Sequence, residues 1–544
     1  MAKVTLKEYS QNDQWLFPPS IGSFVPPNSP ARLVSDIVDQ LDITEVMDTY
    51  CGGGTSSYHP RMMLKVIFFG YMNNIYSCRK IEKQMSENVL YMWLSGNQHP
   101  DFRTINDFRS KHLKTTINRL FVQVVVMLCE MGCLSLREAY IDGTKIESRA
   151  NRYTFVWRKS VEKNRSKLES KIRSILSQIE EGIAQDNHTD DDPTTPINSE
   201  ELKERIARIN RENLSKADTK AMKELENKMR PKLEEYERKL SALGERNSYS
   251  KTDLDATFMR MKEDAMNNGQ TKPGYNLQIA TSRQFITWFS LFPNPTDTLT
   301  FIPFVSEFQS TYGSPLEETT ADSGYGSEEN YTYLENEGIT PFVKYNYFHK
   351  EQHRPFKTNP FIVNNLHYNA EADYYVCPMG QHMEYMDTIR NVSDNGFVSY
   401  SSIYEARNCH GCPLRSQCHK SAGNRRVSVN HNLNRLKKIA FDLLISEEGL
   451  RRRSRRPIEP EAVFGQIKTD MGYKRFRHFG KDLVMMDFGI LATAFNLKKL
   501  WKRVAKTAFF VRYCKIQPSK MAIQGFLSIP ESVVHFSEQE RLAA

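Results

Sequence analysis

The chain lacks the long apolar run that a membrane-spanning helix needs. Its longest apolar stretch, Phe121–Cys129, contains a glutamine and falls far short of the ~20 residues that cross a bilayer. The first residues carry Lys3 and Lys7 and no apolar leader, so export is not expected. Cysteine is scarce as well. An odd number of cysteines, nine in 544 residues, argues against a disulfide scaffold and favours reduced thiols in a cytoplasmic protein.

The composition excludes a disordered chain. Apolar residues make up 39% and aromatic residues 11% of the sequence, which is enough to bury sizeable cores. At about 150 residues per domain, the length allows roughly two to four domains.

The overall charge of +9 hides an uneven distribution. Residues 420–520 hold 24 lysines and arginines against 8 acidic residues, a net charge of +16, so the rest of the chain carries −7. A concentrated basic segment indicates a polyanionic partner, most often nucleic acid. The alternative is an ordinary solvated face.

The N-terminal part is predicted to be helical. Residues 1–30 contain five prolines and are expected to form an extended lead-in. Apolar residues then recur at helical spacing over 31–131. We interpret this region as a helix-turn-helix DNA-binding domain, the alternative being an ordinary helical bundle. Its candidate DNA contacts are Arg79, Lys80, Arg103 and Arg109.

Residues 157–269 are predicted to form a helical-hairpin insertion. Apolar residues from Leu168 to Ile183 step by three or four, and a second such series runs from Leu225 to Leu240. A polar, proline-containing break separates the two series. The hairpin either pairs subunits or packs as an insertion.

Strand-like segments that alternate with helical ones predict an α/β core. Asp142 and Asp322 each end a strand-like run, the usual place for a catalytic group in an open α/β sheet. Glu461 lies at the start of a helix predicted over 460–506, and Lys468 follows two turns along the same face. Three carboxylates in one cleft suit Mg²⁺ or Mn²⁺, and two such ions stabilise both oxygens of an in-line phosphodiester displacement.

Four short motifs surround these acids, at Tyr140–Glu147, Lys272–Asn276, Ala321–Tyr325 and Glu461–Lys468. They resemble bacterial insertion-sequence transposases of the DDE type, in the IS-four-like superfamily and its IS eleven-eighty-two group. The resemblance covers about residues 15 to 510.

This resemblance implies a ribonuclease-H-like catalytic core built from residues 132–156, 270–345 and 426–510, followed by a C-terminal tail over 511–544. Asp142, Asp322 and Glu461 would be its metal ligands. The protein would bind the terminal inverted repeats of its element as a homodimer on double-stranded DNA, cleave a strand and transfer it to target DNA. It would act in the bacterial cytoplasm, associated with the nucleoid. The alternatives are a metal-dependent nuclease on the same fold and a catalytically inactive DNA-binding regulator.

One superfamily pattern is only partly present. It places an arginine four residues before the glutamate and a lysine seven residues after it. Lys468 fits, but Pro457 stands four before Glu461 and the nearest arginine is Arg456. Glu459 competes with Glu461 for the third acidic position, and we prefer Glu461 because it aligns with the motif.

A second insertion, residues 346–425, holds four of the cysteines, and we expect them to bind a structural Zn²⁺. These are Cys377, Cys409, Cys412 and Cys418. His382, His410 and His419 are possible substitute ligands. The alternative is a set of unligated thiols.

An arginine run precedes Glu461 directly. We expect its members to clamp DNA phosphates at the mouth of the metal site. They are Arg451, Arg452, Arg453, Arg455 and Arg456.

Overall fold

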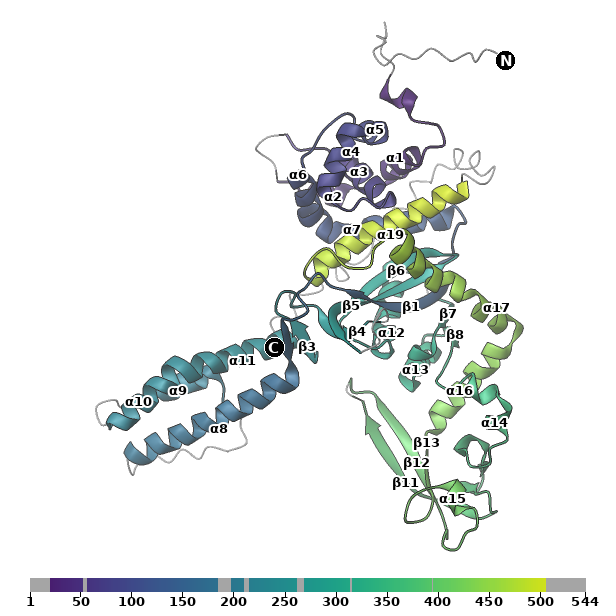
Figure 1. Cartoon of the computed structure of the whole chain (residues 1–544). Helices are drawn as coiled ribbons and strands as arrows, with labels where there is room; N and C mark the ends of the chain where they lie inside the picture. Colours follow the sequence, from purple (N-terminus) through teal and green to yellow (C-terminus); the bar gives the residue numbers. More distant parts are fainter. Residues whose placement is uncertain are drawn as a thin grey trace, which may run out of the picture. The chain divides into compact units, whose positions relative to one another are not determined.

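The computed structural model describes residues 20–51, 56–183, 197–209, 215–261, 269–313, 316–393 and 395–504. The protein is mixed α/β, and Figure 1 labels its elements. Among the described residues, one compact unit comprises residues 20–133 with residues 486–504, and a second unit comprises residues 134–485.

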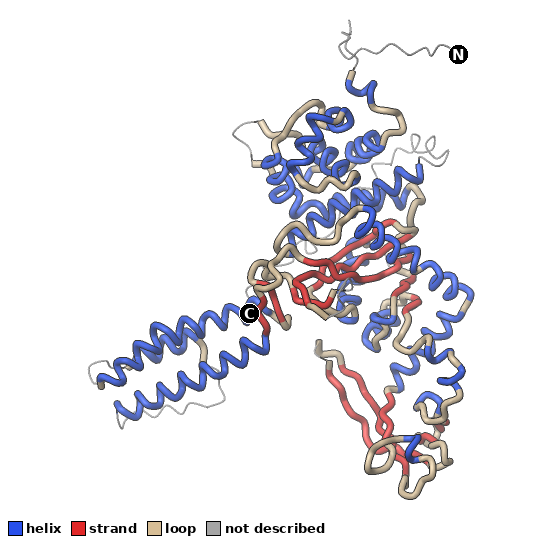
Figure 2. Tube along the Cα trace, in the orientation of Figure 1, coloured by secondary structure: helices blue, strands red, loops and turns tan. Residues whose placement is uncertain are grey.

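The first unit is helical over its described residues, as the apolar spacing predicted (Figure 2). Its helices are α1 (Pro30–Gln40), α2 (Thr44–Asp48), α3 (Pro60–Met72), α4 (Cys78–Glu87), α5 (Val89–Leu94), α6 (Phe102–Asp107) and α7 (Leu113–Glu130). Proline in the first turn of α3 starts that helix, and nearly all its side chains are buried. The buried carboxylate of Asp487 connects segments of the first unit that are far apart in the sequence. It accepts hydrogen bonds from the Tyr71 hydroxyl and from Arg109 Nη2, the latter at 2.6 Å.

The second unit contains a six-stranded sheet in the order β4-β5-β1-β7-β8, with β6 pairing on β5. The strands are β1 (Glu138–Glu147), β4 (Thr257–Arg260), β5 (Thr271–Ser282), β6 (Phe285–Phe292), β7 (Glu318–Ala321) and β8 (Thr340–Val343). β1, β5 and β6 are antiparallel neighbours, whereas β1, β7 and β8 run parallel. Helices α12 (Phe301–Tyr312) and α13 (Glu328–Asn336) connect β6 to β7 and β7 to β8.

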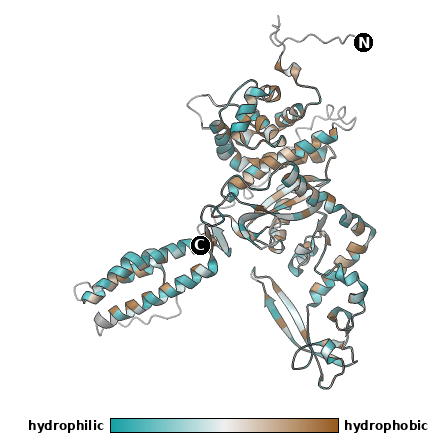
Figure 3. Cartoon of the chain, in the orientation of Figure 1, coloured by the Kyte–Doolittle hydropathy of each residue, from teal (hydrophilic) through white to brown (hydrophobic). Residues whose placement is uncertain are grey.

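The predicted insertion is an arm of helices. Strands β2 (Phe155–Trp157) and β3 (Ser248–Ser250) pair at its base. Its helices are α8 (Arg158–Ile183), α9 (Ser199–Arg208), α10 (Lys216–Glu224) and α11 (Arg230–Leu243). Their apolar faces form a shared core that includes Ile172, Leu202 and Leu233. The apolar periodicity is therefore satisfied within the arm, and Figure 3 shows the arm as predominantly hydrophilic.

The cysteine-rich insertion carries a five-stranded antiparallel sheet in the order β13-β12-β11-β10-β9. Its strands are β9 (His367–Asn369), β10 (Tyr374–Val376), β11 (His382–Val392), β12 (Val398–Ala406) and β13 (Arg426–Val429), and its short helices are α14 (Arg354–Lys357) and α15 (Arg415–Cys418).

The C-terminal part differs from the single helix predicted over 460–506. Helices α16 (His431–Ile445) and α17 (Glu447–Arg455) lead into π-helical turns at Pro457–Glu461 and Gln466–Asp470 that flank α18 (Ala462–Gly465). The chain then leaves the helix at Gly472, whose φ of 64° suits glycine, and α19 begins at Lys481 and runs to Val504. Within the described ranges, every helix is too short or too polar to cross a bilayer.

Candidate active site

Strands β1 and β7 bring the two predicted aspartates together. Their parallel pairing runs from Glu138 opposite Glu318 to Tyr140 opposite Thr320. Asp142 and Asp322 each lie two residues further on, so they project from the same face. We expected Asp142 to end its strand, but it lies within β1, at the point where β1 no longer pairs with β7. Asp322 directly follows β7.

One arginine contacts all three predicted acids. Arg456 Nη2 lies 3.3 Å from Asp142 Oδ1 and 3.4 Å from Asp322 Oδ2, and Arg456 Nη1 lies 2.6 Å from Glu461 Oε1. The arginine side chain is 8% exposed and Asp142 10%, whereas Asp322 is 46% and Glu461 48% exposed. The group, here called the Arg456 cluster, has a buried floor and two accessible carboxylates. Arg456 Nε is buried and has no hydrogen-bond partner among the described residues.

The π-helical turn explains how Arg456 reaches Glu461. In an α-helix, residues four apart lie above one another, whereas a π-turn brings residues five apart into this relation. The turn at Pro457–Glu461 is π-helical. It therefore places Arg456, five residues before Glu461, where an α-helix would place an arginine four residues before it. The π-turn thus lets Arg456 take the place of the arginine that the superfamily pattern puts four residues before the glutamate, where this chain has Pro457.

Glu459, the competing third acid, points elsewhere. It is buried, and its Oε2 accepts a hydrogen bond of 2.6 Å from the Gln284 backbone amide. Glu461, by contrast, lies on the same guanidinium as Asp142 and Asp322.

A second arginine makes a similar cluster one helical turn earlier. The side chain of Arg452 is 8% exposed and forms ion pairs with Glu138, Glu318 and Glu448. Glu138 starts β1 and Glu318 starts β7, so Arg452 joins the beginnings of the two strands whose later residues meet at Arg456. We call this group the Arg452 clamp. Arg452 was expected to contact DNA, but its burial among three carboxylates leaves it no surface to offer to a phosphate.

The remaining members of the arginine run point in different directions, because consecutive residues of a helix are turned by about 100°. Arg451 makes a two-pronged contact with Glu448 at 2.7 and 2.8 Å. Arg453 stacks over the Phe348 ring, 5.1 Å from its centroid. Arg455 is exposed. The run therefore does not form one phosphate clamp at the mouth of the site.

Two cations lie beside the acids. Lys468 Nζ donates a 2.9 Å hydrogen bond to Thr144 Oγ1, two residues beyond Asp142 on β1. Lys344 directly follows β8. The pKa of its ammonium group is lowered, mainly by burial and then by the nearby positive charge of Arg456. The sequence predicted Lys468 but not Lys344, which lies in no motif.

A fourth carboxylate, Asp297, adjoins the site and was also missed. Its Oδ1 accepts hydrogen bonds from Asn276 Nδ2 at 2.8 Å and from Gln278 Nε2 at 3.0 Å. A Cβ atom at Gly143 would lie 2.2 Å from Gln278 Nε2 and 2.7 Å from Asp297 Oδ1. A side chain at the position after Asp142 would therefore displace Gln278 and Asp297 from this polar network. The only feature of the local sequence that could have indicated this contact is Gly143.

The predicted DNA contacts of the first unit divide into two groups. Arg79 and Arg103 are exposed and lie over the ring of Phe102, with distances of 4.6 and 5.7 Å to its centroid, and Lys80 is exposed as well. Arg109, in contrast, is 3% exposed and bonded to Asp487. Its burial is incompatible with the expected phosphate contact.

The four clustered cysteines line one pocket together with Arg425. The Arg425 backbone amide donates to Cys409 Sγ at 3.3 Å, and its Nη1 donates to Cys418 Sγ at 3.1 Å. All four are free thiols. His419 also lines this pocket.

Over the described ranges, no three histidine, cysteine or acidic side chains are already arranged around one point as metal ligands. The donor sets nevertheless fit the expected metals. Asp142, Asp322 and Glu461 supply hard oxygens around the single guanidinium group of Arg456. The four sulfurs of the cysteine pocket suit Zn²⁺, and two of them already accept hydrogen bonds from Arg425.

Two parts of the chain match known protein families. Residues 19–111 match a family described as Transposase domain (DUF772). Residues 376–501 match a family described as Transposase DDE domain, a range that includes Glu461 and Lys468 but begins after Asp142 and Asp322. No curated protein matches the chain.

Both matched descriptions are of transposases, so the chain carries transposase domains at both ends of its described part. The second match makes residues 376–501 similar to a transposase DDE domain, which supports an enzyme that acts on DNA.

Proposed function

We propose that this protein is a DNA transposase that binds the terminal inverted repeats of an insertion sequence, as a homodimer on two ends, and catalyses strand cleavage and strand transfer. The observation that carries the proposal is the convergence of Asp142, Asp322 and Glu461 on Arg456. The strand order supports a ribonuclease-H-like core, because three antiparallel strands, β6, β5 and β1, are followed by two parallel ones, β7 and β8. We also assign the chain to the IS eleven-eighty-two group on its motifs.

In this proposal the three acids hold divalent cations. Bound Mg²⁺ or Mn²⁺ would stabilise the charge that develops on the attacking and leaving oxygens of a phosphodiester. Asp142 offers a nearly buried carboxylate fixed on β1, while Asp322 and Glu461 offer accessible ones. Lys468, held at Thr144, and Lys344, beside β8, are positioned to contact the phosphates of the bound strand.

The first unit supplies end recognition in this proposal. Arg79, Lys80 and Arg103 present exposed positive charge on α4 and α6. The guanidinium groups of Arg79 and Arg103 share the Phe102 ring, which fixes their positions on the surface. We assign these three residues to the DNA backbone and leave Arg109 to the buried pair with Asp487.

The proposal is tested with the full chain and linear DNA that includes the sequences flanking its gene, in the presence of Mg²⁺. The wild type should cleave at the element end and join the freed 3′ end to target DNA. Asp142→Asn should bind the DNA and do neither, whereas Glu317→Gln, a surface acid paired with Arg137, should do both. Cleavage without joined products would favour the nuclease, and binding without cleavage would favour the regulator.

We propose further that the cysteine pocket binds a structural Zn²⁺. The supporting observation is that Cys377, Cys409, Cys412 and Cys418 line one pocket although Cys377 is far from the other three in the sequence. Elemental analysis of the purified chain should find about one zinc per molecule, which Cys412→Ser should lose. Cys78→Ser, outside the pocket, should keep it. Equal zinc content in the two variants would contradict the assignment.

A further inference from the structure

The outward face of α8 carries a regular row of lysines. Lys159, Lys163, Lys167 and Lys171 are spaced by four residues, and all four are exposed. Four residues advance an α-helix by about 6 Å and turn it only slightly past a full turn. The ammonium groups therefore form a nearly straight line along the arm. We call the first three the α8 lysine row.

The members of this row are not neutralised by the protein. Of the four lysines, Lys171 has a partner, Glu224, at 3.0 Å. The nearby acids of α8 are paired with arginines: Glu162 with Arg158 at 3.3 Å and Glu169 with Arg165 at 2.8 Å. Over the part of the chain that the structure describes, Lys159, Lys163 and Lys167 have no ion pair.

Hydroxyl groups complete the face. Ser166, Ser170 and Ser174 are exposed and, by their helical spacing, alternate with the lysines on the same side. The two acids of α8 between Lys159 and Ser177, Glu162 and Glu169, are each paired with an arginine and not with a lysine of the row. Ammonium and hydroxyl groups are both hydrogen-bond donors to phosphate oxygens.

The row contributes nothing to the packing of the arm. The opposite side of α8, which includes Ile172, Leu176 and Ile179, is buried against the other helices. Like charges four residues apart on a helix destabilise it slightly, so these three lysines repel one another. An anionic partner along the row would remove that repulsion.

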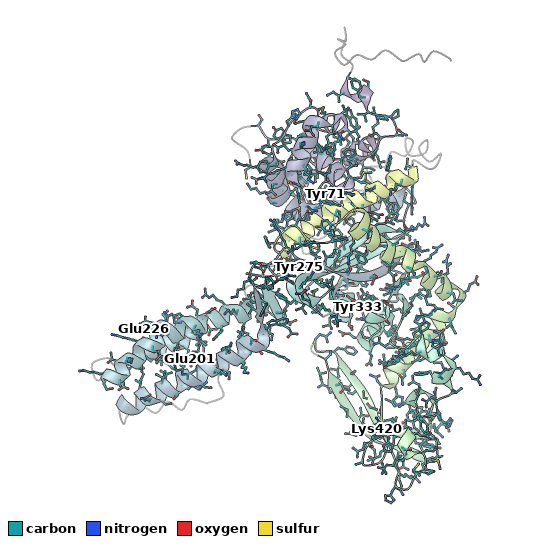
Figure 4. All side chains as sticks on the ribbon, viewed as in Figure 1. Tyr71, Glu201, Glu226, Tyr275, Tyr333 and Lys420 are labelled. Atoms are coloured by element: carbon teal, nitrogen blue, oxygen red, sulfur yellow. The ribbon has the colours of Figure 1, made fainter. Side chains whose placement is uncertain are left out.

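The exposed surface of the arm is polar. No large apolar side chain is exposed on the described residues of helices α8 to α11. An apolar subunit interface on this face is therefore not supported. Of the acids labelled in Figure 4, Glu201 lies in α9 and Glu226 in the π-turn before α11, and neither belongs to α8.

We propose that the α8 lysine row binds the phosphate backbone of double-stranded DNA. This inference rests on the proposed function, since it adds a second DNA-contacting surface to a DNA transposase. The row covers about 12 Å between Lys159 and Lys167, and successive phosphates of one strand advance about 3.4 Å along the duplex axis. Three lysines thus match one short stretch of a single backbone without reading its sequence.

The test measures the salt dependence of DNA binding by the full chain. The probe is a mixed-sequence duplex of about 60 base pairs, and binding is followed by fluorescence anisotropy from low to moderate salt. The row variant combines Lys159→Gln, Lys163→Gln and Lys167→Gln. The matched control combines Lys220→Gln, Lys228→Gln and Lys232→Gln, which removes the same charge from exposed lysines on the other helices of the arm.

Each phosphate contact contributes about 0.9 to the slope of log affinity against log salt. The row variant should therefore lower the magnitude of that slope by about two to three and weaken binding roughly 100-fold at 0.15 M salt. The control should keep nearly the wild-type slope. The melting temperature of the row variant should equal or exceed that of the wild type, because repulsion has been removed.

Three results would overturn the proposal. Row and control variants with the same slope would exclude a specific contact. A changed oligomeric state with an unchanged slope would assign the row to an acidic protein surface. A loss of helix content in the row variant would assign it a structural role. In each case, Mg²⁺-dependent cleavage by the wild type would still support the proposed function, so the two failures are distinguishable.

Discussion

The Arg452 clamp and the Arg456 cluster are two versions of one arrangement. Each has a buried arginine from the same helical segment, one acid from β1, one acid associated with β7 and one acid from the C-terminal helices. All the strand and arginine positions are displaced by four: Glu138 to Asp142, Glu318 to Asp322, and Arg452 to Arg456. The same two strands are thus joined to the helix at two successive levels.

The two levels differ in how tightly the acids hold their arginine. Arg452 Nε lies 2.5 Å from Glu448, and the two strand acids contact Arg452 closely as well. Arg456 lies 3.3 and 3.4 Å from its two aspartates, and only Glu461 is close, at 2.6 Å. Four strand residues advance about 13 Å and four helical residues about 6 Å, so one helix cannot meet both levels equally well. The clamp is satisfied, and the cluster keeps carboxylate oxygens available.

The largest expected effect is on strand cleavage, which should depend on the Arg456 cluster and not on the Arg452 clamp. Asp322→Asn should lower the rate of strand cleavage about 1000-fold or more, because several kcal/mol of metal-dependent charge stabilisation is lost. Glu318→Gln, four residues earlier at the start of β7, should cleave at nearly the wild-type rate. The measurement is single-turnover cleavage of an end-containing duplex. Comparable losses in the two variants would remove the distinction between cluster and clamp.

For the free energy of unfolding we expect the reverse order, with the Arg452 clamp contributing more than the Arg456 cluster. Arg452→Met leaves two strand carboxylates and Glu448 without their cation and should lower the free energy of unfolding by about 3 kcal/mol. Arg456→Met should cost less, about 2 kcal/mol, because nearly buried Asp142 loses its cation but water can reach Asp322 and Glu461. Urea unfolding followed by circular dichroism measures both. A larger loss at Arg456 would show that it, and not Arg452, holds the strands to the helix.

Metal addition should stabilise only proteins with an intact cluster. A ligand at 100 times its Kd stabilises the native state by about 2.7 kcal/mol. Mn²⁺ should therefore raise the melting temperature of the wild type and of Glu138→Gln, but leave that of Asp142→Asn unchanged. If Asp142→Asn responds like the wild type, the metal binds outside the cluster.

The smallest effect concerns acid sensitivity of the clamp. Hydrogen bonds from Arg451 and then Arg452 lower the pKa of Glu448 below its ordinary value of 4.5. Such a carboxylate contributes stability above that value and loses it as the pH falls through the lower folded-state pKa. The melting temperature of Glu448→Gln should therefore be slightly lower than that of the wild type at pH 7 and converge with it only as the pH falls through the lowered folded-state pKa of Glu448. A constant difference over that range would contradict the role of the charge.

Local patterns predicted much of the fold. Strong apolar periodicity gave the helices of the first unit and of the arm, because each series is buried inside its own unit. The predicted strand before Asp322 and the strands around 275–280 and 285–289 are present. The prediction of one continuous helix over 460–506 was wrong, because the chain leaves the helix at Gly472. Apolar residues recur on both sides of this break, so their spacing does not reveal it.

The sequence by itself determined which acids stand beside strands, which cysteines share an insertion and where positive charge gathers. Only the tertiary structure decided which charges face solvent. Arg109, Arg452 and Arg456 look like surface residues in the sequence, yet carboxylates from distant segments hold each of them inside. Asp297 joined the site for the same reason, since its neighbours Asn276 and Gln278 lie on another part of the chain. A buried charge is stabilised by partners that no local pattern contains.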